Sequence, residues 1–231
     1  MKRLMLIGLA LICSNAIAGE IIIKQKIHES LPEYEFRIEV STSVMDEFGH
    51  YKIEKIVVSD KDGKAIQSFE KFETQEIMYF ILDSTSSPAP KNIIDLITQS
   101  IINSKFISFQ DANFDGYLDL GVTKWFGAHN ICDNYWLYDK NTGKFMYDKE
   151  LSDLSDAEFD PKTKTIYEYF GSGRHNNERK TYKFDEKGKL LLLKEEKEEY
   201  DYESPFYYKF TKELKGRKMV VTSSETIKIK K

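Results

Sequence analysis

Cysteine is scarce in this chain of 231 residues, which contains only Cys13 and Cys132. Cys13 lies in an N-terminal stretch with the features of a leader, so the mature protein is expected to keep a single thiol. One cysteine cannot form an intramolecular disulfide, and the sequence therefore excludes a small scaffold stapled by disulfide bonds. A bound metal ion is the other device that could stabilise a domain of this kind.

Long hydrophobic runs are also missing, apart from one near the N-terminus. Basic residues precede an apolar run over residues 4–12, and Ala16-Ile17-Ala18 provides a small-x-small cleavage pattern. This arrangement predicts a secretory signal peptide over residues 1–18. The run is shorter than the roughly 20 residues of a transmembrane helix, so we expect no insertion into a membrane. We predict an exported protein located in the periplasm.

An excess of basic residues is absent as well. The chain has 34 Lys and Arg against 38 Asp and Glu, and loss of Lys2 and Arg3 with the leader leaves 32 against 38, a net charge of −6. Proteins that bind nucleic acid present a basic surface to the phosphates, so a nucleic-acid partner is not expected. A cationic protein partner would be attracted to this chain.

Short runs of aromatic and β-branched residues recur along the whole chain, with turn residues between them. Such runs are typical of β-strands, and they predict a mostly β protein with an antiparallel β-sandwich. The predicted strands span residues 20–27, 34–40, 51–58, 77–82, 106–109, 120–126, 135–138, 164–169, 180–184, 190–193, 206–211 and 219–222.

Three segments share a polar bend that ends in Gly-Lys, at residues 60–64, 139–144 and 185–189. Glycine adopts the positive φ of tight turns without steric cost, so each segment predicts a β-hairpin. None has the alternating acidic pattern of a metal site. The charged run 194–203 is expected to be a solvated strand end or a linker.

The segment from Asp111 to Asp119 reads Asp-Ala-Asn-Phe-Asp-Gly-Tyr-Leu-Asp. Oxygen-bearing side chains thus alternate along it, with glycine at the sixth position. Calcium takes about six to eight oxygen ligands, and this alternation is typical of a calcium loop. A solvated turn rich in Asp and Asn is the alternative interpretation. We predict Ca²⁺ binding by the side chains of Asp111, Asn113, Asp115 and Asp119 and by the carbonyl of Tyr117.

The loop departs from an EF-hand at its twelfth position. An EF-hand has a bidentate Glu there, whereas this chain has Val122. Leu120 and Val122 alternate around Gly121 as residues of a strand do. We therefore expect the loop to connect two β-strands rather than two helices.

One short helix is expected before this loop. Prolines at 88 and 90 interrupt the strand pattern, and apolar residues between 92 and 104 follow near-helical spacing, with Asn92 as the N-cap. A boundary near residue 88 would separate a β-unit over 19–88 from a calcium-loop β-sandwich domain over 89–231. One continuous domain over 19–231 fits the sequence equally well.

Further motifs follow the predicted calcium loop in a fixed order. They are Tyr-Trp-Leu-Tyr-Asp at 135–139, Thr-Gly-Lys-Phe at 142–145, Glu-Leu-Ser-Asp-Leu at 150–154 and Phe-Asp-Pro at 159–161. This block resembles exported bacterial calcium-binding proteins related to the lysozyme-inhibitor-type immunity proteins of interbacterial secretion systems. The resemblance implies a β-sandwich similar to periplasmic inhibitors of invertebrate-type lysozyme, with the five loop residues as metal ligands. It also implies that some members plug the cleft of a peptidoglycan-cleaving effector.

A loop that could enter such a cleft lies at residues 171–179. Lysozyme-type glycosidases expose a groove with two carboxylates, and Arg174 could pair with one of them. Ser172, His175 and Tyr182 could add hydrogen bonds. An ordinary flexible hairpin tip is the alternative interpretation of this loop.

A second candidate loop spans residues 127–134, directly after the strand that follows the calcium loop. An exposed Trp136 next to it would be a suitable interface anchor. His129 and Cys132 within this loop have a zinc-like spacing, but a structural zinc site needs four ligands and the sequence offers no partners for them.

These observations favour a periplasmic, calcium-binding inhibitor or immunity-type protein that blocks a peptidoglycan-degrading enzyme, either a muramidase or a lytic transglycosylase. We expect no enzymatic activity, because no nucleophile elbow, phosphate loop or dinucleotide fingerprint is present. One alternative is a calcium-stabilised extracytoplasmic structural or adhesion module without inhibitory activity. Another is a hydrolase that uses calcium only for stability.

Overall fold

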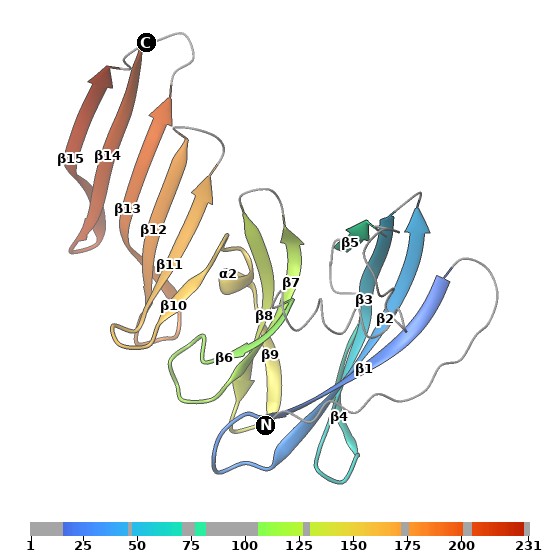
Figure 1. The fold of residues 1–231 in the computed structure, drawn as a ribbon. Helices are drawn as coiled ribbons and strands as arrows, with labels where there is room; N and C mark the ends of the chain where they lie inside the picture. The colour runs from blue at the N-terminus through green and yellow to red at the C-terminus, as the bar shows by residue number, and fades with distance from the viewer. Residues whose placement is uncertain are drawn as a thin grey trace. The chain divides into compact units, whose positions relative to one another are not determined.

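The computed structural model describes residues 16–45, 48–70, 77–81, 106–126, 130–171, 176–200 and 205–228. Over these residues the chain is mostly β, with antiparallel sheets and one short helix, which confirms the fold class expected from the sequence (Figure 1). The described residues contain no helix that is both long enough and apolar enough to cross a membrane.

Five strands of the N-terminal part form one sheet in the order β1-β2-β3-β4, with β5 also paired to β3. Successive side chains of a strand point to opposite faces of the sheet. On β2, Phe36, Ile38 and Val40 are buried while the residues between them are not, so these three side chains mark the buried face of this sheet. The strands are β1 (Ala16–Lys26), β2 (Glu33–Met45), β3 (Phe48–Ser59), β4 (Ala65–Glu70) and β5 (Ile77–Ile81).

The middle of the chain forms a four-stranded sheet in the order β6-β7-β8-β9. Its strands are β6 (Ile107–Gln110), β7 (Asp119–Phe126), β8 (Ile131–Asp139) and β9 (Lys144–Asp148). Leu120 and Val122 of β7 are fully buried. Because β6 ends at Gln110 and β7 begins at Asp119, the predicted metal loop connects two strands, as expected, rather than two helices.

The C-terminal part is a six-stranded antiparallel meander in which each strand pairs with the next one in sequence. The strands are β10 (Glu158–Asp160), β11 (Thr165–Gly171), β12 (Asn177–Phe184), β13 (Leu190–Tyr200), β14 (Phe206–Lys215) and β15 (Lys218–Lys228). The charged run that begins at Lys194 thus belongs to β13 up to Tyr200. No described residue of β12 to β15 is buried.

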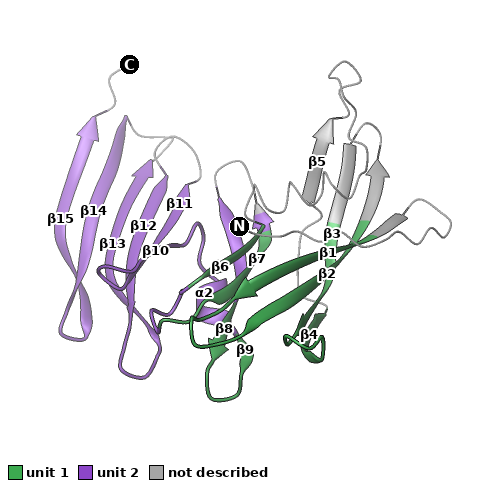
Figure 2. Cartoon of the chain, turned by 60° about the horizontal axis from the view of Figure 1, so that its bottom comes forward, with its two compact units in different colours: residues 1–110, 116–124, 136–146 green, residues 111–115, 125–135, 147–231 purple. Residues whose placement is uncertain are grey.

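The chain divides into two compact units (Figure 2). Unit 1 comprises residues 1–110, 116–124 and 136–146, and unit 2 comprises 111–115, 125–135 and 147–231. The units are therefore interleaved in sequence within the middle third of the chain. The predicted boundary at residue 88 lies outside the described residues.

Unit 1 has an aromatic core between its two sheets. The Phe36 ring of β2 lies 4.7 Å from Phe109 of β6 and 5.7 Å from Phe145 of β9, measured between centroids. Phe69 of β4 lies 5.2 Å from Trp136 of β8. Tilted and edge-on aromatic pairs at these distances are favourable, and they bury the facing sides of both sheets.

All three predicted hairpins are confirmed. They join β3 to β4, β8 to β9 and β12 to β13. The same device closes the first and last of them. Asp60 Oδ1 accepts hydrogen bonds from the N–H groups two and four residues later, at 3.0 and 2.9 Å. Asp185 repeats these contacts, and its bonds from the Lys189 and Lys187 N–H groups lower the pKa of its carboxyl.

The short helix of the described structure is not the predicted one. Helix α2 (Lys149–Ser152) follows β9, and its N-cap Asp148 accepts a hydrogen bond from the Leu151 N–H at 2.9 Å. The helix predicted over 92–104 lies outside the described residues. Strands β4, β9 and β10 were not predicted, because their sequences are short or poor in β-branched residues.

Replacing Phe145 by alanine tests the core of unit 1. Phe145 is 2% exposed and contacts three other aromatic rings, so Phe145→Ala is expected to lower the free energy of unfolding by about 3–5 kcal/mol. The neighbouring Met146 is 55% exposed, and Met146→Ala is expected to cost less than about 0.5 kcal/mol. Urea denaturation followed by tryptophan fluorescence measures both values. Equal losses would contradict the packing described.

Candidate functional site

In the first half of the loop between β6 and β7, two oxygen-bearing side chains accept hydrogen bonds from one backbone amide. The N–H of Asp115 donates to Asp111 Oδ1 at 2.9 Å and to Asn113 Oδ1 at 3.1 Å. Asn113 Nδ2 also donates to Asp115 Oδ2 at 3.2 Å. The chain then turns at Gly116, whose φ of 93° is open to glycine and disfavoured for other residues.

The second half of the loop is held by aromatic stacking within unit 1. The Tyr117 ring lies 4.5 Å from His28 and 5.5 Å from Tyr138, stacked with both. Beside it, the Leu118 N–H donates to the carbonyl of Ile27 at 2.9 Å. The backbone of Tyr117, whose carbonyl is a predicted ligand, is thus fixed by the turn between β1 and β2. The sequence gives no sign of this contact, because no spacing rule relates His28 to Tyr117.

Asp119 has a different environment from the other predicted ligands. Its residue is fully buried, and its Oδ1 accepts a hydrogen bond from the Tyr138 N–H at 2.8 Å. The Tyr138 hydroxyl in turn lies 3.1 Å from that of Tyr34, and burial together with this contact raises the pKa of Tyr138. Asp119 therefore has a structural role in joining β7 to β8, and this role does not depend on a bound metal ion.

The donor chemistry of the loop fits a hard cation. Two carboxylates and an amide oxygen stand at Asp111, Asn113 and Asp115, and oxygens of this kind are what Ca²⁺ prefers. The Lys164 ammonium group donates to the carbonyl of Phe114 at 3.3 Å. Within the described residues, no group of three or more His, Cys, Asp and Glu side chains is placed to hold a metal. Calcium binding by these five residues stays a prediction.

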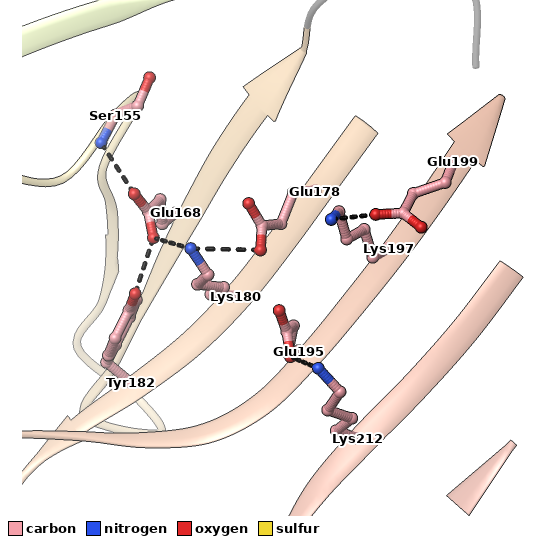
Figure 3. Close-up of polar contacts among 9 residues, drawn as sticks. All are labelled: Ser155, Glu168, Glu178, Lys180, Tyr182, Glu195, Lys197, Glu199 and Lys212. Carbon is pink, nitrogen blue, oxygen red and sulfur yellow. Dashed lines mark hydrogen bonds and ion pairs between the residues drawn. The ribbon is translucent and has the colours of Figure 1, made fainter. Parts of the chain in front are cut away.

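The residues predicted to bind a partner differ in their structural environments. Ser172, Arg174 and His175 lie outside the described residues. The Tyr182 hydroxyl donates to Glu168 Oε2 at 2.7 Å, and burial with this contact raises the pKa of Tyr182 (Figure 3). Trp136 is 6% exposed and packs on Phe69, which is the environment of a core residue. The exposure required of an interface anchor is not observed.

The structure joins the two predicted partner-binding loops through Asn130 and Gly171. The second of these loops was predicted over 127–134, but residues 131–134 belong to strand β8. Asn130, directly before β8, donates from Nδ2 to the Gly171 carbonyl at 3.1 Å. The Gly171 N–H donates back to Asn130 Oδ1 at 3.0 Å. Asn130 is 8% exposed, so both bonds are shielded from water. This amide clamp fixes Gly171, at the start of loop 171–179, against Asn130.

Close packing around Gly171 supports the clamp. A Cβ atom at this position would meet the Tyr169 hydroxyl at 3.1 Å and Asn177 Oδ1 at 3.3 Å. These two groups already bond to each other at 3.0 Å. A larger residue at the base of the loop would therefore require the Tyr169 or Asn177 side chain to shift by a few tenths of an ångström.

The chain has no counterpart in the comparisons with known proteins: no family model, curated protein or solved structure matches it. The resemblance to calcium-binding immunity proteins therefore stays a prediction based on the order of its motifs. The arguments for function depend on the loop and the clamp themselves.

Substituting Asn130 tests the clamp. Asn130→Ala removes the partner of both the N–H and the carbonyl of Gly171, and a buried polar group without a partner costs about 1–3 kcal/mol. We expect a loss of that size in the free energy of unfolding, and faster amide hydrogen exchange at Gly171. Exposed Asn141 bonds only within its own turn, so Asn141→Ala is the control. Unchanged exchange at Gly171 would contradict the clamp.

Proposed function

We propose that this protein is a calcium-stabilised, non-enzymatic periplasmic inhibitor. It would block a peptidoglycan-degrading enzyme, either a muramidase or a lytic transglycosylase. The observation that carries the calcium part is the convergence of Asp111 and Asn113 on the N–H of Asp115, followed by a glycine turn. The inhibitory part is supported by the clamped base of loop 171–179.

Calcium would supply positive charge to a loop that is rich in carboxylates. Asp111 Oδ1 accepts a hydrogen bond from the Asp115 N–H, and Asp115 Oδ2 accepts one from Asn113 Nδ2. Both carboxylates thus belong to one short segment, and their negative charges repel each other. The second half of the loop is already held by Tyr117 stacking and by Asp119. The effect of the ion is therefore expected mainly at residues 111–115.

Inhibition would depend on Arg174. A guanidinium group pairs with a carboxylate through two parallel hydrogen bonds, and the cleft of a lysozyme-type enzyme contains two carboxylates. The clamp between Asn130 and Gly171 holds the residue at which this loop starts. The net charge of −6 expected after leader removal favours approach to a cationic enzyme.

A calcium-stabilised structural or adhesion module is the second candidate function. The six-stranded sheet favours it, because none of the described residues of β12 to β15 is buried. A sheet of this kind offers a large surface for contact with another macromolecule. This function predicts partner binding with no effect on peptidoglycan hydrolysis.

Calcium binding is testable by thermal melting with and without a chelator. An ion at 100 times its dissociation constant stabilises a fold by about 2.7 kcal/mol, so chelation should visibly lower the melting temperature. Asp115→Ala should abolish this dependence, whereas Asp62→Ala, at an exposed hairpin position, should preserve it. Asp119→Ala should lower the melting temperature even with chelator, because the Tyr138 N–H loses its acceptor. A melting temperature indifferent to calcium refutes the metal site.

Inhibition is testable with purified peptidoglycan and a panel of muramidases and lytic transglycosylases. The purified protein should slow the loss of turbidity caused by at least one enzyme. Arg174→Ala should weaken this protection at least tenfold, since removing one partner of a desolvated charge pair costs about 2–5 kcal/mol. Arg217→Ala, in the exposed turn between β14 and β15, serves as the control. Binding to an enzyme without protection would favour the adhesion module.

A further inference from the structure

The six-stranded sheet has two edges of very different length. Strand β10, at one edge, has 3 residues, whereas β15, at the other, has 11. Within the described part of the chain, no strand pairs with the outer side of β15. An edge strand presents unpaired N–H and C=O groups, and natural proteins protect such edges by shortening them or by placing proline or lysine in them. β15 is long, contains no proline and has lysine only at its two ends, Lys218 and Lys228.

The middle of β15 also lacks charge. Residues 219–224 read Met-Val-Val-Thr-Ser-Ser, and Val220 and Val221 are 45% and 56% exposed. An uncharged run of six residues with β-branched side chains on an open edge is a template for pairing with another strand. Two charged residues of the strand, Lys218 and Glu225, flank this run, and a third, Lys228, ends the strand.

An irregularity in the pairing of β14 with β15 places these two charges on the same face. Thr211 pairs with Ser223 and Lys212 pairs with Val221, so Thr222 is the extra residue of a β-bulge. The alternation of side chains changes sides at such a bulge. Lys218 and Val220 therefore share a face with Ser223 and Glu225, although the spacing from 218 to 225 is odd.

Directly opposed charges in this sheet have opposite signs at nearly every position. The row Lys180, Glu195, Lys212 crosses β12, β13 and β14 (Figure 3). A second row places Lys209 between Glu198 and Glu225. The exception among the described pairs is Lys215, which stands opposite Lys218. Lys218 thus has a like charge on its inner side.

We propose that β15 pairs in antiparallel fashion with β15 of a second copy of this chain, with Lys218 opposite Glu225 of the second copy. Two-fold symmetry then repeats this pair at the other end, and Val220 lies opposite Ser223 of the second copy. Facing residues must share a face of the sheet, and the bulge at Thr222 allows this for the odd spacing. The row Glu198, Lys209, Glu225 continues with Lys218 of the second copy in alternating sign. This dimer is independent of the calcium site and of the enzyme partner.

Sedimentation velocity of the purified chain at micromolar to millimolar concentrations tests the dimer. We expect a reversible dimer whose dissociation constant rises about tenfold in Lys218→Glu and in Glu225→Lys, because each change replaces two attractive pairs by repulsive ones. The double variant Lys218→Glu with Glu225→Lys restores both pairs and should recover the original constant. Lys228→Glu lies outside the paired segment and should leave the constant unchanged.

Val221→Lys provides a second test that does not depend on the charged positions. Its side chain is mostly exposed in the single chain, so the fold should persist, as circular dichroism will show. Two added lysines would meet near the symmetry axis and should abolish the dimer. A monomer at all concentrations overturns the proposal. A dimer that both single charge reversals leave intact, or that the double reversal does not restore, overturns the proposed register.

Discussion

The aromatic cluster around Phe145 is the contact on which unit 1 depends. Its ring packs against Phe36, Phe69 and Tyr138 from three different strands. The backbone of the same residue is bound by the Gln67 side chain, which donates to the Phe145 carbonyl at 2.7 Å and accepts from its N–H at 2.9 Å. A side-chain amide here takes the place of a neighbouring strand. Two sheets are thereby fastened without a covalent link.

The predicted metal loop is attached to this cluster through Tyr138. Its ring lies 5.2 Å from Phe145 on one side and 5.5 Å from Tyr117 on the other, and its N–H is bound by Asp119. The half of the loop that begins at Gly116 is therefore ordered by packing. Under the proposed function, an ion would act mainly on the half that contains the carboxylates of Asp111 and Asp115, and the core acts on the other half.

Strands β12 to β15 of unit 2 differ from this aromatic core. The strands β12 to β15 bury no described residue, and their facing charges form rows such as Lys180, Glu195 and Lys212. Each such pair contributes only about 0.2–1 kcal/mol, so backbone pairing carries most of the cohesion. Among the described residues, β15 is the last strand of this sheet, and none of its residues is buried.

The sequence by itself determined most of the strands, but not β4, β9 or β10, and it determined the three Asp-to-Gly hairpins, because side-chain alternation and turn chemistry act over a few residues. It also located the loop from Asp111 to Asp119, since ligand spacing is local. Tertiary structure decided that Trp136 is core, that His28 supports Tyr117 and that Asn130 clamps Gly171. Those contacts join residues far apart in the chain, and no local pattern encodes which distant side chain will fill a given space.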